Sequence, residues 1–362
     1  MRPLLVVLGT RPDAIKLAPV VREARRRGWP VDILATGQHA ALFADTGFPA
    51  EFPLTALDTP NMGDPFAFAD AALARLRGWV YDQPAHLTVV QGDTSSAWAG
   101  GRFAVERGWS LIHLEAGLRT GDLADPWPEE GFRRDLDRWA ALRLAPTPLA
   151  LKTLMDEGLG QGSVLVGNTV VDALHALGVL YVPMPLRPRI VLVTLHRRES
   201  WGEPLAHIVE GIRAVALEHE NRHGYVFRWP AHLAPAVQLA ASGVRDWTRT
   251  WKTAANVWVE EPMPYPRFVR TLAYARAVVT DSGGVVEEAA TLGVPCVIAR
   301  DQTERMEAVR AGHALLAGRT ADGIATALRQ CINGVVSSRP SLVFGDGTAA
   351  QGACDAIARA FA

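Results

Sequence analysis

Cysteine and lysine are both scarce in this chain. Its 362 residues include 3 cysteines, and no two of them are close in sequence. They therefore predict neither a disulfide framework nor a zinc knuckle. Of the 37 basic residues only three are lysines, so each lysine is easier to weigh. The lysines are Lys16, Lys152 and Lys252, and the cysteines are Cys296, Cys331 and Cys354.

Strong charge and long apolar runs are also lacking. The formal net charge of −1 argues against a nucleic-acid or membrane-surface partner. No apolar segment reaches the length of a membrane span, and residues 1–9 are too short for a signal sequence. We therefore expect a cytoplasmic protein with no membrane partner. The hydrophobic content of 49% with 21% charge is ordinary for a globular chain, and the length allows two domains.

Short apolar segments that suit buried strands alternate with helix-forming segments such as 66–76 and 95–107. The first series of strands is expected at 4–8, 31–36, 87–91, 111–114 and 142–145, and the second at 189–195, 225–229, 257–260, 277–280 and 295–299. This alternation predicts an α/β protein with parallel, doubly wound sheets. The proline-rich segment 182–188 is the expected linker between two Rossmann-like domains, 1–180 and 181–345. The ligand is expected in a cleft between these domains.

The segment 280–291, TDSGGVVEEAAT, has the residue types of an anion site. Gly283 and Gly284 leave no side chain where the backbone would meet a ligand, and Ser282 precedes them. The helix that follows directs its N–H groups and positive dipole end to the same place, which suits a phosphate. Glu288, about one turn into that helix, could bind the two hydroxyls of a ribose. The alternative is an ordinary strand-to-helix turn with a Ser or Asp N-cap.

Several polar residues follow the carboxyl ends of predicted strands, which is where open parallel sheets bind ligands. Asp93 and Glu115 follow two successive strands, and His196 follows the first strand of the second series. The loop 116–128 ends at Glu129-Glu130, so Glu129 could fold back towards Glu115. Three carboxylates close together would share a proton and form an acid/base set without metal or cofactor. The alternative is that Glu129 and Glu130 are the normal acidic first turn of a helix.

The motifs together resemble a known family, the non-hydrolysing UDP-N-acetylglucosamine (UDP-GlcNAc) 2-epimerases. They occur in the family's order: GTRPDAIKLAPV at 9–20, TGQH at 36–39, GDT at 92–94, LEAGLRTGD at 114–122, PWPEE at 126–130, VGNTVVDAL at 166–174, HRRESWG at 196–202, DSGGVVEEA at 281–289 and RDQTERMEAV at 300–309. The resemblance implies the GT-B fold, with a final segment 346–362 whose helix, at 349–361, returns to the first domain. It also implies a homodimer, no cofactor and a role in supplying a cell-surface polysaccharide.

The resemblance implies inversion at C2 of the sugar, which interconverts UDP-GlcNAc and UDP-N-acetylmannosamine (UDP-ManNAc). C1–O cleavage would expel UDP and leave 2-acetamidoglucal, to which UDP then adds back. The implied catalytic residues are Asp93, Glu115, Glu129 and His196. The implied substrate-binding residues are Arg11, Lys16, Arg133, His232, Ser282, Gly283, Gly284, Glu288 and Arg305, and no metal ligand is expected.

Some residues depart from the family's pattern. Asp13 stands where a Glu is usual, Val286 where a Gln is usual, and Met306 where a Pro is usual. Many bacterial members bind a second UDP-GlcNAc as activator, through polar residues after the QH pair and an arginine further on. Here Ala40-Ala41 follows His39, and 58–68 contains no arginine, so weak or absent activation is expected.

Other functions remain open from the sequence. These are a GT-B glycosyltransferase, a non-catalytic nucleotide-sugar sensor, a hydrolysing epimerase, and an epimerase for a modified sugar such as a 2,3-diacetamido derivative. A transferase would share the nucleotide site but would not need the Asp93, Glu115 and Glu129 set.

Overall fold

The computed structural model describes residues 1–38, 46, 48–60, 62–79, 85–179, 181–183, 186–220, 224–232, 237–243 and 254–361. The chain forms two compact units. Unit 1 consists of Met1–Ala176 together with Phe344–Ala362, and unit 2 consists of Leu177–Val343. None of the helices formed by the described residues is long and apolar enough to cross a membrane.

In the described part of unit 1, seven parallel strands form one sheet in the order β3-β2-β1-β4-β5-β6-β7. The strands are β1 (Leu4–Leu8), β2 (Val31–Ala35), β3 (Thr55–Ala56), β4 (Leu87–Gln91), β5 (Ser110–Leu114), β6 (Leu142–Ala145) and β7 (Ser163–Leu165). The helices are α1 (Arg11–Arg26), α3 (Phe48–Glu51), α4 (Pro65–Trp79), α5 (Ser95–Glu106), α6 (Glu129–Trp139), α7 (Pro148–Asp156), α8 (Thr169–Ala176) and α15 (Ala349–Phe361).

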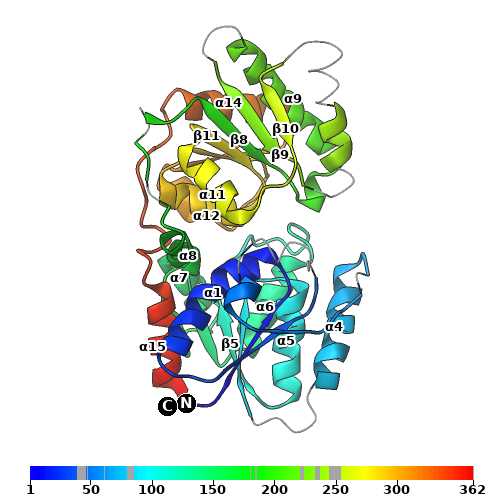
Figure 1. Ribbon diagram of the computed structural model, residues 1–362, viewed down its shortest axis with the longest axis vertical. Helices are drawn as coiled ribbons and strands as arrows, with labels where there is room; N and C mark the ends of the chain where they lie inside the picture. Colours follow the sequence, from blue (N-terminus) through cyan, green and yellow to red (C-terminus); the bar gives the residue numbers. More distant parts are fainter. Residues whose placement is uncertain are drawn as a thin grey trace. The chain divides into compact units, whose positions relative to one another are not determined.

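Both faces of this sheet are covered, which explains why β1 is apolar at every position. Successive side chains of a strand point to opposite faces. Leu4, Val6 and Leu8 pack with residues of α1 and α15 on one face. Leu5 and Val7 pack with residues of α4 and α5 on the other face. Buried strands of this kind are typical of parallel sheets with helices on both sides (Figure 1).

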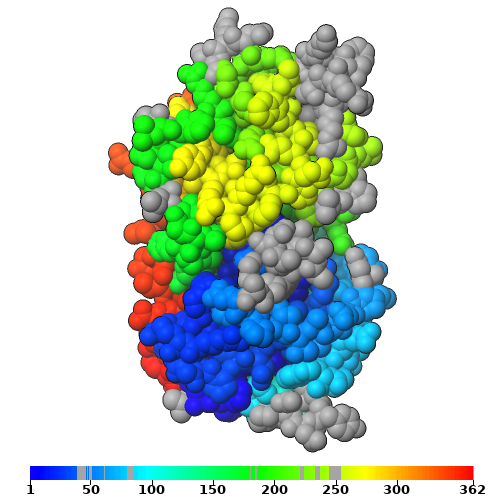
Figure 2. All heavy atoms as spheres, in the orientation of Figure 1, coloured from blue at the N-terminus to red at the C-terminus, as the bar shows by residue number. Residues whose placement is uncertain are grey.

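The last helix, α15, packs against the first helix, α1. Arg27, at the end of α1, pairs with Asp355 at 2.7 Å. Asp172 of α8 accepts from the backbone N–H of Ala350 at 2.9 Å, near the start of α15. Cys354 lies in the same apolar cluster as Leu17 of α1. The red C-terminal residues therefore lie along the blue N-terminal ones in Figures 1 and 2.

In the described part of unit 2, six parallel strands follow the order β10-β9-β8-β11-β12-β13. The strands are β8 (Ile190–Thr194), β9 (Val226–Pro230), β10 (Val257–Glu260), β11 (Ala277–Thr280), β12 (Cys296–Ile298) and β13 (Ala314–Leu316). The helices are η3 (Arg198–Ser200), α9 (Glu203–His219), α11 (Tyr265–Tyr274), α12 (Gly283–Leu292), α13 (Met306–Arg310) and α14 (Ala321–Ile332).

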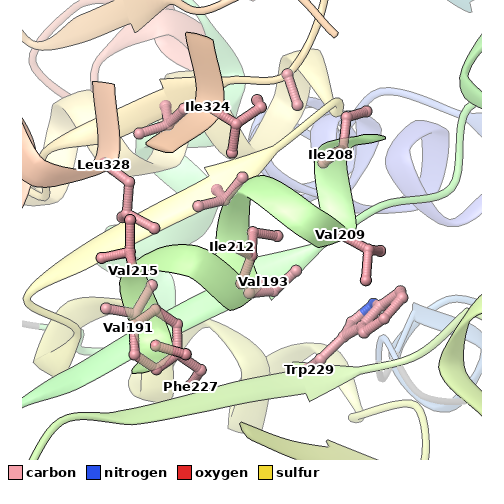
Figure 3. Close-up of a cluster of buried hydrophobic side chains, with 14 of the residues drawn as sticks. Val191, Val193, Ile208, Val209, Ile212, Val215, Phe227, Trp229, Ile324 and Leu328 are labelled. Atoms are coloured by element: carbon pink, nitrogen blue, oxygen red, sulfur yellow. The ribbon is translucent and has the colours of Figure 1, made fainter. Parts of the chain in front are cut away.

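The core of unit 2 lies between its sheet and the helices α9 and α14. Phe227 and Trp229 of β9 and Val191 of β8 are buried there. Ile212 of α9 and Leu328 of α14 pack in the same cluster (Figure 3). The side chains from both helices converge on the strands, so this face of the sheet is closed to solvent.

The fold class predicted from the sequence is confirmed: both sheets are parallel and have helices on both faces. Every expected strand is present, with ends that shift by at most one residue at either end. The two sheets have the same kind of strand order. In each, the first three strands along the chain run outward to one edge, and the fourth strand then pairs with the other side of the first. The point where this order reverses is where such sheets bind ligands.

Candidate functional site

The switch point of unit 1 lies between β1 and β4, and Asp13 joins the chain segments that follow these strands. Thr10 is the N-cap of α1, and Asp13 completes a capping box with it. Asp13 Oδ2 accepts from the backbone N–H groups of Gly9 and Thr10, both at 3.0 Å. The hydroxyl of Thr94, beyond β4, donates to the same oxygen at 3.3 Å. Burial raises the pKa of Asp13 to about 6, although these hydrogen bonds act in the opposite direction.

Asp93, the first predicted catalytic carboxylate, lies two residues beyond β4 and pairs with Arg133 of α6. The buried guanidinium of Arg133 contacts Asp93 Oδ2 through Nη2. Its Nη1 donates to Glu130 Oε2 at 2.9 Å, and Glu130 is fully buried. Glu130 also accepts from the backbone N–H of Thr120 at 3.1 Å. Arg133 therefore lies between the predicted catalytic carboxylate and a carboxylate that anchors the loop after β5.

Glu115, the second predicted carboxylate, directly follows β5 with a backbone φ of 69°, which non-glycine residues rarely adopt. Its Oε2 contacts the ammonium of Lys16, from α1, and accepts from Gln91 Nε2 at 2.7 Å. The Lys16 and Glu115 side chains are only 5% and 7% exposed. Backbone strain and a buried ion pair at one residue are typical of a functional position.

The structure thus brings several of the predicted residues of unit 1 together. β4 and β5 are adjacent, with Gln91 opposite Leu114, so Asp93 and Glu115 leave the sheet side by side. Each has a cation beside it, Arg133 and Lys16 respectively. The expectation that these carboxylates share a proton with Glu129 stays a prediction.

Glu129 and Arg11 are the first residues of their helices, α6 and α1. Glu129 and Glu130 form the acidic first turn that was the alternative interpretation of this pair, and a carboxylate there suits the positive end of a helix. The anchoring contacts described above belong to Glu130. Catalysis by Glu129 and substrate binding by Arg11 stay predictions.

The switch point of unit 2 lies between β8 and β11, and Asp281 joins the ends of these two strands. Its two carboxylate oxygens accept from the backbone N–H of His196, both at 3.0 Å. Oδ2 also accepts from the N–H of Arg197 at 2.9 Å. The ring of His196 lies 5.8 Å from the ring of His232, so the two predicted histidines are neighbours.

The predicted phosphate-binding turn lies at the start of α12, which begins earlier than expected. Ser282 is the N-cap, and Gly283 and Gly284 are the first two helical residues rather than part of the preceding turn. The Ser282 side chain makes no capping hydrogen bond within the described part of the chain. The uncapped N-terminus fits an anion better than it fits the alternative of a side-chain N-cap.

Arg305 packs against the glycine turn and is held by two buried carboxylates. It donates through Nε to Glu287 at 2.8 Å and through Nη1 to Glu304 at 2.6 Å. A Cβ at Gly283 would lie 2.9 Å from the Arg305 guanidinium carbon, so a larger residue there would displace the end of the Arg305 side chain. Arg305 therefore contributes positive charge directly beside the helix N-terminus.

Glu288, the predicted ribose contact, is buried in α12 and accepts from the hydroxyl of Tyr265 at 2.8 Å. Tyr265 is the first residue of α11. Tyr265 was not predicted, because it lies 23 residues from Glu288 in the chain and within a proline-rich segment. Asp281 was also missed, although its position directly after a strand was a usable signal.

Among the residues that the structure describes, no three His, Cys, Asp or Glu side chains are grouped so that they could hold a metal ion. Several sequence predictions lie outside the described residues. These are His39 and Ala40–Ala41 of the activator motif, residues 184–185 of the linker, and residue 180 at the domain boundary.

Comparisons with known proteins cover almost the whole chain. A family model described as UDP-N-acetylglucosamine 2-epimerase matches residues 22–358. The UDP-N-acetylglucosamine 2-epimerase of Bacillus subtilis (strain 168) is 33% identical over 364 residues, which cover 96% of this chain and 93% of that protein.

Two solved structures are similar over the full length. The UDP-GlcNAc 2-epimerase from Neisseria meningitidis bound to UDP-GlcNAc has a TM-score of 0.85 and 27% identity, over 99% of this chain and 100% of that one. The Methanocaldococcus jannaschii UDP-GlcNAc 2-epimerase in complex with UDP-GlcNAc and UDP has a TM-score of 0.83 and 28% identity, over 99% of both chains. These likenesses confirm the GT-B type of fold.

Proposed function

Because the chain belongs to the UDP-N-acetylglucosamine 2-epimerase family, we propose that it interconverts UDP-GlcNAc and UDP-ManNAc by inverting C2 of the sugar. The observation that carries this proposal is the family match over nearly the whole chain. The site of unit 1 supports it, because Asp93 and Glu115 follow adjacent strands and each lies beside a cation.

C2–H is not acidic, because the amide is attached through nitrogen and no carbonyl adjoins that carbon. Breaking the C1–O bond first, or in the same step, solves this problem. The C2–H electron pair then forms the C1=C2 double bond of 2-acetamidoglucal, a basic group takes the proton, and UDP leaves with the C1–O electrons. Re-addition of UDP at C1, with a proton delivered to the opposite face of C2, gives the epimer.

The carboxylates of unit 1 and His196 of unit 2 act on the same sugar nucleotide in this proposal. Asp93, Glu115 and Glu129 supply the acid and base groups that proton removal and return require on two faces. Glu115 is well prepared for such a role, since Lys16 and Gln91 fix its carboxylate. Asp281 fixes the backbone from which the His196 side chain extends.

The departing diphosphate needs positive charge and N–H donors. We assign them to Ser282, Gly283 and Gly284 at the start of α12, where the helix dipole favours an anion. Glu288 binds the ribose in this proposal. The remaining substrate contacts come from five residues: Arg11, Lys16, Arg133, His232 and Arg305.

Product analysis by NMR tests the proposal directly. Purified enzyme with UDP-GlcNAc as sole substrate gives UDP-ManNAc, and UDP-ManNAc alone gives UDP-GlcNAc. Free ManNAc and UDP would instead indicate a hydrolysing enzyme. No change without an added acceptor would indicate a glycosyltransferase or a sensor. Turnover only of a 2,3-diacetamido substrate would indicate an epimerase for a modified sugar.

We also propose that activation by a second UDP-GlcNAc is weak or absent. The basis is the sequence, where Ala40-Ala41 follows His39 and 58–68 contains no arginine. Rates that rise hyperbolically with UDP-GlcNAc support this, as does UDP-ManNAc turnover without added UDP-GlcNAc. Sigmoidal kinetics contradict it. A homodimer and a cytoplasmic location complete the proposal, and sedimentation of the purified protein tests the first.

A further inference from the structure

A fully buried histidine–aspartate pair lies beneath the two loops that carry Asp93 and Glu115. His113 is on β5, and Asp137 is on α6; both side chains are 0% exposed. His113 Nδ1 lies 2.7 Å from Asp137 Oδ1, and His113 Nε2 lies 2.7 Å from the carbonyl oxygen of Gly92. No role in catalysis described above uses either side chain.

Both ring nitrogens of His113 lie within hydrogen-bond distance of a buried polar partner. A carbonyl oxygen only accepts, so Nε2 donates to Gly92. Asp137 Oδ2 accepts from the backbone N–H of Gly117 at 3.1 Å and pairs with Arg119 Nη1 at 2.7 Å. Asp137 therefore joins three groups, the His113 ring at Oδ1 and the Gly117 amide and Arg119 guanidinium at Oδ2.

The surroundings of the pair favour the ionised form of Asp137. Burial alone would raise the pKa of Asp137, but His113 and Arg119 offset it and lower the pKa below its ordinary value. Arg143, from β6, donates through Nε to the backbone oxygen of Asp137, and Glu157 pairs with Arg119 Nη2 at 2.7 Å. An unpaired charge buried this deeply would be strongly unfavourable, so each partner requires the other.

The pair binds two backbone groups, the carbonyl of Gly92 and the N–H of Gly117, and each lies next to a predicted catalytic carboxylate. Gly92 directly precedes Asp93, and Gly117 is the second residue after Glu115. Both glycines have positive φ, 67° and 88°, so the chain turns at each of these points. One buried unit thus fixes the start of one loop through its histidine and the other loop through its aspartate.

We propose that His113 and Asp137 are positioning residues, which hold the loops of Asp93 and Glu115 in the geometry that proton transfer at C2 requires. The inference rests on the proposed epimerase function. The pair does not touch substrate; it acts by fixing backbone on both sides of the two carboxylates. Small displacements of catalytic groups lower rates sharply, so loss of the pair should reduce turnover more than nucleotide binding.

The test compares His113→Gln and Asp137→Asn with His86→Gln. His86 is a matched control, because it is also a fully buried histidine of unit 1 with an aspartate partner, Asp32 at 2.9 Å. It precedes β4, at the end of that strand away from Asp93. We expect kcat to fall about tenfold or more in the two test variants, with the Kd for UDP unchanged, and to stay at the wild-type value in the control. Test and control variants with equal kcat would overturn the proposal.

Two measurements test the pair without the reaction. Both are made on wild-type protein, so they remain informative if His113→Gln or Asp137→Asn folds poorly. NMR of wild-type protein should show a slowly exchanging, hydrogen-bonded proton on His113 Nε2, because this nitrogen donates to the Gly92 carbonyl. Hydrogen exchange should show the Gly117 amide protected in wild type and in His86→Gln. A His113 Nε2 without a hydrogen-bonded proton, or a Gly117 amide that is unprotected in wild type, would overturn the inference. Wild-type protein that turns over no UDP-sugar would contradict the proposed function instead, while these two measurements still decide whether the pair exists as described.

Discussion

The carboxylate of Asp281 holds the backbone N–H of His196 at 3.0 Å, across the switch point of unit 2. Asp13 makes the corresponding connection in unit 1, where it accepts from Thr94 at 3.3 Å. In both units an aspartate thus joins the segments that follow the first and the fourth strand along the chain, which are neighbours in the sheet. The strand ends that carry the candidate site are fixed by side chains of the same type.

Replacing Asp281 with Asn should lower kcat about tenfold to a hundredfold, because the side chain loses its charge and one of the two oxygens that accept from the His196 and Arg197 N–H groups, so that His196 is held less firmly. Loss of charge-assisted hydrogen bonds should also reduce the free energy of unfolding by about 1.5–3 kcal/mol. Asp322→Asn, at an exposed position on α14, is the control. Steady-state kinetics and urea unfolding measure both effects. Wild-type turnover in Asp281→Asn would show that His196 needs no such support.

Asp93→Asn and Glu115→Gln should each lower turnover by roughly a hundredfold or more, since each removes an acid or base group and keeps the shape of the side chain. UDP binding should be unchanged in both, as measured by calorimetry. Near-normal rates in both variants would remove these carboxylates from the mechanism.

The strained backbone at Glu115, with φ at 69°, predicts an unusual order of stability. Ala in the left-handed region costs about 1–2 kcal/mol, and the greater freedom of unfolded Gly offsets part of this, so Glu115→Gly should be more stable than Glu115→Ala by about 0.5–1 kcal/mol. The same pair of substitutions at Glu210, inside α9, should give the opposite order. Unfolding in urea measures both differences. An Ala variant as stable as the Gly variant at 115 would argue against the strain.

Asp13 predicts a pH-dependent contribution to stability. Its pKa is about 6 in the folded chain against 3.8 for the ordinary carboxyl, so the folded state binds this proton more tightly. The stabilisation is therefore fully present below about pH 4 and is lost as pH rises through about 6. At 1.36 kcal/mol per unit the full effect is about 3 kcal/mol, of which about half falls between pH 5 and pH 8.

The measurement is the free energy of unfolding of wild type relative to Asp13→Asn, as a function of pH. Wild type should gain on the variant as pH falls from about 8 to about 5. Asp70→Asn, an exposed control on α4, should show no such trend. A wild-type advantage that does not change with pH would mean that Asp13 stays ionised throughout.

Tyr265→Phe should weaken UDP binding about threefold to tenfold, because Glu288 loses the hydroxyl that orients it. The variant should also discriminate less between UDP and 2′-deoxy-UDP, since Glu288 is the proposed ribose contact. Tyr274→Phe, at the exposed end of the same helix, is the control. Equal discrimination in wild type and Tyr265→Phe would separate Glu288 from ribose recognition.

The strands that sequence reasoning missed are short and lie at sheet edges. β3, β7 and β13 have two or three residues each, and each occupies an edge of its sheet. Segments of this length show no apolar run or period, and they form strands only because a neighbouring strand offers hydrogen-bonding partners. The long central strands were predictable because burial on both faces makes them continuously apolar.

The residues of the candidate site also include some that the sequence predicts and contacts that it does not. Asp93, Glu115 and His196 could be placed because each follows a predictable strand. The contacts between site residues could not be predicted from the sequence. Arg133 reaches Asp93 only through the packing of α6, and Tyr265 reaches Glu288 only through the packing of α11. The predicted start of α12 was too late in the chain because glycine is a poor helix former, whereas Gly283 and Gly284 form its first two residues, with Arg305 packed against Gly283.

Proton exchange at C2 tests the central claim most directly. UDP-GlcNAc is incubated with the enzyme alone in D2O, and the recovered sugar nucleotides are analysed by NMR and mass spectrometry. We predict one deuterium at C2 in UDP-ManNAc, and in recovered UDP-GlcNAc after it has passed through the reaction. Epimerised product that keeps its original C2 hydrogen, or recovered UDP-GlcNAc with neither deuterium nor epimer, would contradict the account.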